Sequence, residues 1–299
     1  MERADQERTQ PYAREQRLQE QLRCLIRPSS ANCQHPSPLG EEASPSMSST
    51  QQAEHYDRII SAYDEHYYDQ SALAYRKEFI LEPLLRDLDL RGKRIADLAC
   101  GSGHTSLFLM ERFPDAKVHG FDISPEACRR YRETTGCPSS EFDLTRLSTP
   151  DEPFDAAIIL GGLHHCVADL PTALKTVSLM LKPGGSLLMF EPNADYFLQF
   201  ARRIWYKVDG YFESDTEGAL SHARMLELAR DRFACEFVKY LGGPAFFLVY
   251  NSLVFRVPLS SKQMIAPVLM TIERVYNRIP GRWPHSSFLA RWVRLAPHS

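Results

Sequence analysis

Short apolar runs alternate with segments of helical periodicity through the middle of the chain. Buried strands are predicted at 93–99, 117–122, 141–144, 154–160 and 186–191. Apolar residues at helical spacing predict a helix at 71–88, before the first strand, and further helices are predicted between the strands at 104–112, 125–134 and 169–181. Strands that alternate with helices in this way indicate βαβ units and a parallel sheet. Such sheets bind ligands beyond the carboxyl ends of their strands.

The pattern changes after Asn193. Residues 194–212 hold seven aromatic side chains, which suit a flat ring, a sugar face or a lipid chain. Further along, a helix is predicted at 222–233 and strands at 235–241 and 288–295.

The N-terminal segment 1–50 differs from the rest of the chain because it is polar and carries few apolar residues. Such a segment cannot bury enough surface to offset its ordering entropy, so we expect a disordered extension. Met47 stands just before the first patterned segment, and translation beginning there is an alternative to a genuine extension.

Composition excludes several classes of protein. The chain has 299 residues, a formal net charge of −3 and 43% hydrophobic residues, which are ordinary values for a soluble globular protein. The near-neutral charge argues against a dedicated nucleic-acid-binding protein. No apolar run is long enough to span a membrane, and the N-terminus lacks the apolar core of a signal peptide.

The seven cysteines are odd in number, have scattered spacings and form no CxxC motif. This pattern argues against a disulfide framework and against a structural zinc site, and no other metal-ligand cluster is evident. We therefore predict no metal and a cytoplasmic protein with reduced thiols.

Three acids follow three of the predicted strands. Asp97 leads into the small-residue turn 99–103, where missing side chains let the backbone approach a ligand. Asp122 ends the next strand, where a carboxylate can accept both hydroxyls of a ribose. Asp143 follows near the third strand and could accept from an adenine amino group. The combination indicates a cofactor that contains adenosine.

A run of ordered motifs strengthens this reading: DLACGSGH, GFDIS, FDLT, GGLHHC and LKPGGSLLMFEPN. With them the chain resembles the class I S-adenosylmethionine-dependent methyltransferases of the small-molecule type, over about 90–193. The resemblance implies a Rossmann-like, doubly wound α/β fold. Its seven-stranded sheet would be mostly parallel, with an antiparallel edge hairpin and a helical substrate cover. It divides the chain into a helical lid at 51–90 and a methyltransferase domain at 91–299, with the cofactor-binding core at 91–193 and the cover and last strands at 194–299.

The resemblance also assigns residues to the cofactor S-adenosylmethionine. Gly101 and Gly103 would flank its methionine part, and Asp97 would help to hold its amino group. Asp122 and Ile123 would lie at the ribose, and Asp143 and Leu144 at the adenine. The first glycine usual in the family's turn is Ala99 here, which makes the path of the loop less certain. A dehydrogenase is the rival interpretation, but its G-x-G-x-x-G motif would need glycine where Ser106 stands.

Two histidines and an acid supply candidate acid–base chemistry. His164 and His165 follow the fourth strand, and Glu191 ends the fifth strand nearby. In some sugar-modifying members of the superfamily, the matching histidine and acid form the catalytic pair. We predict His165 as the base with Glu191 as its orienting partner. The alternative is that one histidine packs beneath the cofactor and the other bonds to a loop backbone.

The segment 56–70 is rich in tyrosine and histidine, and in similar enzymes this region closes over the cofactor, often through a tyrosine. Tyr63, His66 and Tyr67 are therefore lid candidates, with Tyr63 predicted to contact the cofactor. Alternatively, these aromatic residues only pack a helix onto the sheet. His222 could reach a substrate, but a helix-capping or surface role is the simpler reading.

The C-terminal segment 256–299 contains seven Lys/Arg residues and one Glu. Within it, 264–279 has apolar residues at helical spacing, and a basic amphipathic helix can lie on an anionic membrane. The alternative is a helix packed on the domain with exposed arginines. Arg202, Arg203 and Lys207 could similarly meet an anionic group or form a solvated face.

The sequence thus predicts a methyltransferase acting on a small molecule, most simply at oxygen of a glycan precursor or secondary metabolite. Carbon methylation of a quinone-like or lipid substrate and a non-catalytic cofactor-binding scaffold are the alternatives. Expected partners are the small-molecule acceptor and, through 256–299, a peripheral membrane contact; no nucleic acid is expected. The pattern leaves the oligomeric state open.

Overall fold

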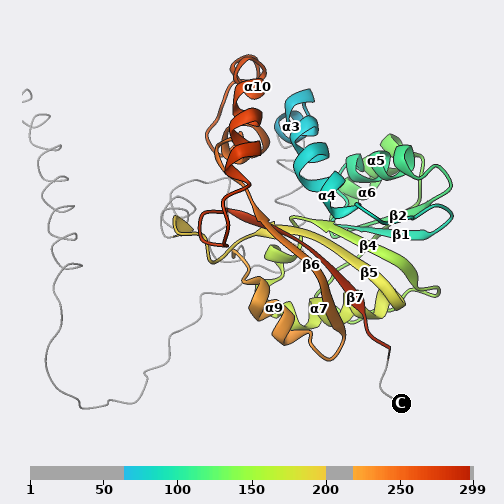
Figure 1. Ribbon diagram of the computed structural model, residues 1–299. Coiled ribbons are helices and arrows are strands. Elements are labelled where there is room, and N and C mark those ends of the chain that lie inside the picture. The colour runs from blue at the N-terminus through green and yellow to red at the C-terminus, as the bar shows by residue number, and fades with distance from the viewer. Residues whose placement is uncertain (1–63, 200–217, 297–299) are drawn as a thin grey trace, which may run out of the picture. The chain divides into compact units, whose positions relative to one another are not determined.

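A seven-stranded sheet in the order β3-β2-β1-β4-β5-β7-β6 forms the centre of the protein (Figure 1). Its strands are β1 Arg94–Leu98, β2 Lys117–Asp122, β3 Ser139–Glu141, β4 Phe154–Leu160, β5 Leu181–Pro192, β6 Phe233–Leu241 and β7 Ser287–Arg294. The first five strands pair in parallel, β7 pairs antiparallel with β5, and β6 pairs antiparallel with β7. This arrangement confirms the predicted mostly parallel sheet with an antiparallel edge.

The computed structural model describes residues 64–199 and 218–296. These residues belong to one compact unit that spans 44–299. Several sequence predictions lie outside the described residues: the disordered segment 1–50, the alternative start at Met47, the lid residue Tyr63, and the cations Arg202, Arg203 and Lys207.

Helices cover both faces of the sheet (Figure 1). They are α3 Gln70–Tyr75, α4 Glu82–Leu84, α5 His104–Arg112, α6 Pro125–Thr135, α7 Leu170–Met180, α9 His222–Leu228 and α10 Leu259–Tyr276. The side chains of α5 share one core cluster with the sheet and with Leu81 and Leu85, which flank α4, and those of α7 and α9 share another on the opposite face. The start of α6 is explained by its sequence: Ser124 accepts a hydrogen bond from the backbone N–H of Ala127 (3.0 Å), and Pro125 takes the first helical position.

The structure differs from the sequence prediction at several element ends. The helix predicted over 71–88 is divided, because a π-helical turn at Arg76–Leu81 separates α3 from α4. The strand predicted at 141–144 is instead β3, which ends at Glu141. Asp143 accepts hydrogen bonds from the N–H and hydroxyl of Thr145 (2.9 and 2.6 Å), and this local turn replaces the strand.

The C-terminal helix α10 is longer at its start than the predicted 264–279 and ends at Tyr276. It lies beside α3 and the π-helical turn Phe246–Tyr250, with which it shares a third core cluster. Among the described residues, no helix is long and apolar enough to cross a membrane.

Candidate active site

The small-residue turn after β1 has a left-handed backbone at three of its five residues. The φ angles are 50° at Ala99, 51° at Gly101 and 87° at Gly103. A side chain at Gly103 would also meet the Thr135 methyl group at 2.6 Å, so glycine is required there for space as well as for conformation. Ala99 replaces the family's usual glycine and retains the turn, at the cost of left-handed strain in a residue with a Cβ.

Asp122 joins this turn to the end of β2. One carboxylate oxygen accepts the backbone N–H of Gly101 (2.9 Å), and the other accepts the N–H of Ser124 (3.0 Å). The side chain is half-buried. A carboxylate is an acceptor-only group with two lone pairs on each oxygen, so an acid at the end of β2 suits the two hydroxyls of a ribose.

Asp97 is a buried acid at the end of β1. The Ser106 hydroxyl donates to its Oδ2 (2.7 Å) and lies at the same distance from the Tyr131 hydroxyl. Burial raises the pKa of Asp97 to about 7, although the Ser106 bond and the positive charge of Arg76 oppose the shift. A cation placed next to Asp97 would therefore stabilise the ionised form of this carboxyl group.

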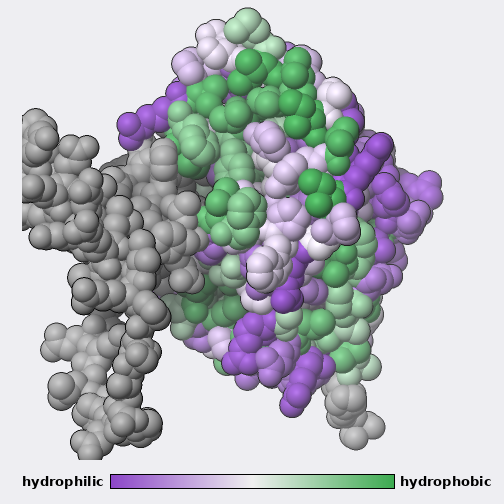
Figure 2. Space-filling view, turned by 60° about the vertical axis from the view of Figure 1, so that its left-hand side comes forward, coloured by the Kyte–Doolittle hydropathy of each residue, from purple (hydrophilic) through white to green (hydrophobic). Residues whose placement is uncertain are grey.

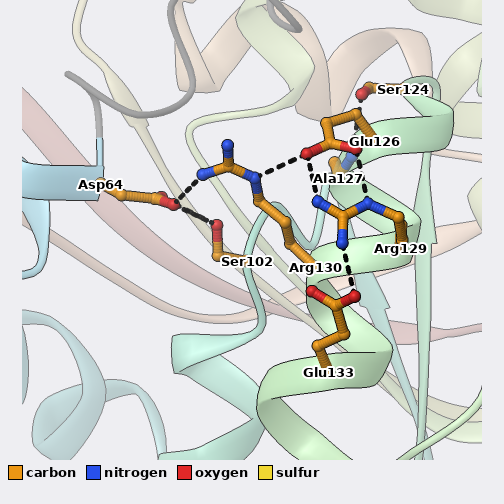
Figure 3. Close-up of polar contacts among 8 residues, drawn as sticks. All are labelled: Asp64, Ser102, Ser124, Glu126, Ala127, Arg129, Arg130 and Glu133. Atoms are coloured by element: carbon orange, nitrogen blue, oxygen red, sulfur yellow. Dashed lines mark hydrogen bonds and ion pairs between the residues drawn. The ribbon is translucent and has the colours of Figure 1, made fainter.

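The segment before α3 lies against the turn through residues other than those predicted (Figure 3). The Ser102 hydroxyl donates to the carboxylate of Asp64 (2.7 and 2.8 Å), which also forms an ion pair with Arg130 at 3.1 Å. The Tyr68 ring stacks on His104, with ring centroids 3.9 Å apart. Asp64 and Tyr68 were missed because the aromatic-rich pattern of 56–70 does not reveal which side chains face the turn.

The two described lid candidates contact a different part of the protein. Tyr67 is buried and donates a hydrogen bond to Asn251, and His66 Nδ1 lies 3.4 Å from the Ser252 hydroxyl. These contacts match the alternative reading, in which the aromatic residues pack the N-terminal segment onto the domain.

Glu191 and His164 form a buried acid–histidine pair at the ends of β5 and β4. Glu191 Oε2 lies 2.9 Å from His164 Nδ1. The same carboxylate accepts backbone N–H bonds from Gly162 (3.1 Å), Leu163 (2.8 Å) and His164 (3.3 Å). Burial raises the pKa of Glu191 to about 8, and the three N–H bonds oppose that shift. In the ionised form of Glu191, which these donors favour, the imidazole carries its proton on Nδ1 and Nε2 is the acceptor.

This pairing corrects the sequence prediction that Glu191 orients His165. The two histidines belong to the single 3₁₀ turn 163–165, and His164 Nδ1 makes the 2.9 Å contact with Glu191. The His165 ring lies beside it, with its centroid 3.9 Å from that of His164.

A close backbone approach connects the acid–histidine pair with the small-residue turn. A Cβ at Gly162 would stand 2.8 Å from the Ala99 Cβ and 2.7 Å from the Ile159 side chain. Glycine at this position therefore lets the two turns touch. Sequence reasoning missed Gly162, although it forms part of the GGLHHC motif.

The remaining site residues are placed as follows. Asp143 lies beyond β3 and forms an ion pair with Arg146 at 3.3 Å. Ile123 and Leu144 are half-buried, and Leu144 packs against the core.

His222 is buried at the start of α9. The indole N–H of Trp292 donates a hydrogen bond to it (3.1 Å), so His222 has a packing role. No group of three or more potential metal ligands occurs in the described parts of the chain.

Comparison with known proteins identifies the class. Residues 95–185 match a family model described as a methyltransferase domain. A demethylmenaquinone methyltransferase from Thermus thermophilus is 39% identical over 109 residues, which are 35% of this chain and 49% of that protein. A trans-aconitate 2-methyltransferase from Streptomyces coelicolor is 38% identical over 113 residues, covering 36% of this chain and 37% of that protein. The chain thus spans about half or less of the length of these relatives.

Solved structures share the fold at low identity. The [4+2]-cyclase SpnF superposes with a TM-score of 0.58 at 15% identity, covering 85% of this chain and 99% of that one. The N-methyltransferase NodS from Bradyrhizobium japonicum, solved with S-adenosyl-L-homocysteine, gives 0.51 at 14% identity, with 81% and 97% coverage. The match over 95–185 and these relatives support a class I S-adenosylmethionine-dependent methyltransferase domain within this chain. The cofactor of this class is S-adenosylmethionine.

Proposed function

We propose that this chain transfers a methyl group from S-adenosylmethionine to a small-molecule acceptor, most simply at an oxygen atom. The supporting observation is the contact between two turns. One turn carries the residues suited to the cofactor, and the other carries the His164–Glu191 pair, and they meet where Ala99 faces Gly162.

The residues around the first turn fit the cofactor chemically. Asp97 is a buried carboxyl group whose ionised form would be stabilised by the cofactor's positively charged amino group. Asp122 is a carboxylate at the end of β2, where an acid can accept the two hydroxyls of a ribose. The backbone of Gly101 and Gly103 would lie along the methionine part. Ile123, Asp143 and Leu144 would line the adenine.

When bound, S-adenosylmethionine supplies an activated methyl carbon, so the chain must align the acceptor and remove its proton. His164 is the proposed base. Its Nε2 would take the proton from the acceptor hydroxyl. The methyl group supplied by the cofactor would go to that oxygen, and the sulfur would keep the electron pair of the broken carbon–sulfur bond and leave as S-adenosylhomocysteine. Glu191 fixes the imidazole tautomer and stabilises the imidazolium that results. His165 lies beside this ring and is the second candidate for the base.

A lipid or quinone acceptor is the second candidate function, and the printed names of the relatives favour it. They include a demethylmenaquinone methyltransferase, a fatty-acid O-methyltransferase from Mycolicibacterium smegmatis and a 2-phytyl-1,4-naphtoquinone methyltransferase from Synechococcus elongatus. A non-catalytic scaffold is the remaining alternative, because the same fold occurs in a protein named as a cyclase. The acid–histidine pair argues against it.

Mass-spectrometric detection of S-adenosylhomocysteine tests the proposal, with the full chain, S-adenosylmethionine and a panel of sugar, phenol, quinone and fatty-acid acceptors. We expect product formation that depends on one acceptor class. H164N should reduce turnover by about 10²–10⁴-fold while cofactor affinity is retained. The control variant E141Q should behave as the wild type, because Glu141 lies on the surface. Cofactor binding without turnover on any acceptor would instead support the scaffold.

A further inference from the structure

The helix α10 turns two of its three charged residues inward and several of its apolar residues outward. Lys262 and Glu273 are both completely buried. On the opposite face, Met264, Val268 and Val275 are 75%, 64% and 61% exposed. A surface helix of a water-soluble domain normally shows the reverse arrangement.

Specific polar contacts hold the helix in this orientation. The Lys262 ammonium group donates to the backbone carbonyl of His66 (2.6 Å) and forms an ion pair with Asp69. These contacts secure the first half of the helix.

The second half of the helix is secured by Glu273. Its carboxylate accepts the Tyr75 hydroxyl (2.9 Å) and the N–H groups of Gly243 (2.8 Å) and Ala245 (2.9 Å). Rotating the helix to bury its apolar side would leave both buried charges without these partners, which is strongly unfavourable. The outward apolar side is therefore a fixed feature of the fold.

The exposed side chains form one continuous surface, which we term the α10 apolar face. It consists of Met264, Val268, Ile272, Val275, Ile279 and Trp283. The first five residues recur at spacings of three or four, so they form a single stripe along the helix and its C-terminal turn. Figure 2 shows hydrophobic residues gathered at the upper end of the molecule, where Figure 1 places α10.

Positive charge borders this face. Between 255 and 283, the exposed charged side chains are Arg256, Arg274, Arg278 and Arg282, and the single acid, Glu273, is buried. Arg274 contacts Glu78 and Arg282 contacts Asp195, so the positive charge of these two is partly offset. Arg278 adds a further exposed positive charge at the C-terminal end of α10, and such charges complement the headgroups of anionic lipids.

We propose that the α10 apolar face docks this protein onto an anionic membrane surface. The helix of 18 residues would lie in the plane of the interface rather than cross the bilayer. Trp283, 66% exposed beside the helix end, is the residue type that favours the headgroup region. A two-fold pair of such helices would bring the bordering arginines together with no exposed acid from 255–283 to meet them, so the charges favour lipid over a second copy.

The docking face is connected to the candidate active site. Lys262 holds the backbone at His66 and the side chain of Asp69, and the same segment carries Asp64 and Tyr68 at the small-residue turn. A docked protein would thus present its site near acceptors dissolved in the bilayer. That choice of acceptor class rests on the proposed function, whereas membrane docking does not.

Co-sedimentation of the full chain with vesicles tests the docking. The vesicles contain equal parts of phosphatidylglycerol and phosphatidylcholine, or phosphatidylcholine alone, and neither cofactor nor acceptor is added. We expect strong binding to the anionic vesicles and weaker binding to the neutral ones. Raising the salt concentration should reduce the difference. The combined variant M264Q/V268T/V275T should lower the partition coefficient by at least roughly tenfold, because three apolar side chains no longer enter the interface.

L147Q is the matched control, because Leu147 is also exposed (55%) but lies away from α10. Its binding should equal that of the wild type, and both variants should unfold at the wild-type temperature. The proposal would be overturned if the wild-type protein pelleted only at background level with both vesicle types. It would also be overturned if the combined variant bound the anionic vesicles as strongly as the wild type. If sedimentation equilibrium showed a wild-type dimer and a monomeric combined variant, and the wild type did not bind vesicles, the face would be assigned to a second copy instead. Because no cofactor is present, a failure of methyl transfer would leave this result unaffected.

Discussion

The affinity for S-adenosylmethionine should depend on pH through Asp97, and the variant D97N should remove this dependence. Asp97 is buried at the end of β1, and burial raises its pKa to about 7. The cofactor's amino group favours the ionised carboxylate, so the protonated fraction must lose its proton before binding. The affinity for S-adenosylmethionine should therefore fall as the pH falls below about 7 and rise as the pH rises toward 7.

The magnitude follows from the same pKa. With a pKa of about 7, roughly 3% of the free protein carries ionised Asp97 at pH 5.5, and about half does at pH 7. The apparent affinity should therefore rise about 16-fold over this interval, which corresponds to roughly 1.6 kcal/mol. A free α-amino group has a pKa near 8, so the ligand's own charge is almost unchanged over the same interval.

Isothermal titration calorimetry at pH 5.5, 6.25 and 7.0 measures this slope. In buffers of different ionisation enthalpy, binding at pH 5.5 should release close to one proton. D97N should bind weakly at all three values with no slope, while the control D115N, at an exposed position, should match the wild type. A flat wild-type profile, or the same slope in D97N, would refute the assignment of Asp97 to the amino group.

Three further predictions concern the turns around the site. G162A should reduce the free energy of unfolding in urea by about 1–3 kcal/mol, because its Cβ would overlap Ile159 and Ala99; a change below about 0.5 kcal/mol would contradict the close approach. A99G should raise the free energy of unfolding by up to about 1 kcal/mol, since relief of left-handed strain exceeds the extra entropy of the unfolded chain. A lower thermal midpoint in A99G would show that the Ala99 methyl contact matters more. D64A should weaken cofactor affinity by roughly tenfold because the Ser102 contact is lost, as measured by calorimetry at pH 7, and unchanged affinity would remove this segment from the site.

The core of the fold was predictable because its signals are local. The strands β2 and β4 coincide with the apolar runs 117–122 and 154–160, and α6 begins at the Ser-Pro pair that caps it. The seven-stranded order and the antiparallel edge came from the family resemblance, because the pairing of distant strands such as β5 and β7 leaves no local mark.

The site contacts that the sequence did not predict correctly depend on where single side chains point, and spacing along the chain does not define this. Adjacent histidines in a 3₁₀ turn look equivalent in sequence, and only the fold shows that His164 meets Glu191. Likewise, Tyr67 and Tyr68 are neighbours, yet one packs near Tyr250 and the other lies on His104.

The orientation of the whole helix α10 also could not be predicted from the sequence. Its periodicity correctly predicted one apolar face, and the ordinary rule would bury that face. The partners that reverse the rule, Asp69 for Lys262 and Tyr75 for Glu273, lie nearly two hundred residues away in the chain. The buried charges therefore decide the orientation, and a pattern of apolar positions cannot contain that information.

Direct binding of S-adenosylmethionine at the turn between β1 and α5 tests the central claim. Equilibrium dialysis of the radiolabelled cofactor would compare the wild type with D122N, whose side chain can no longer accept from both Gly101 and Ser124. D115N is the control, and excess NADH is the competitor. We predict saturable binding to the wild type and to D115N, a large loss of affinity in D122N, and no competition by NADH. Equal binding by D122N, or displacement by NADH, would contradict the assignment of this turn to S-adenosylmethionine.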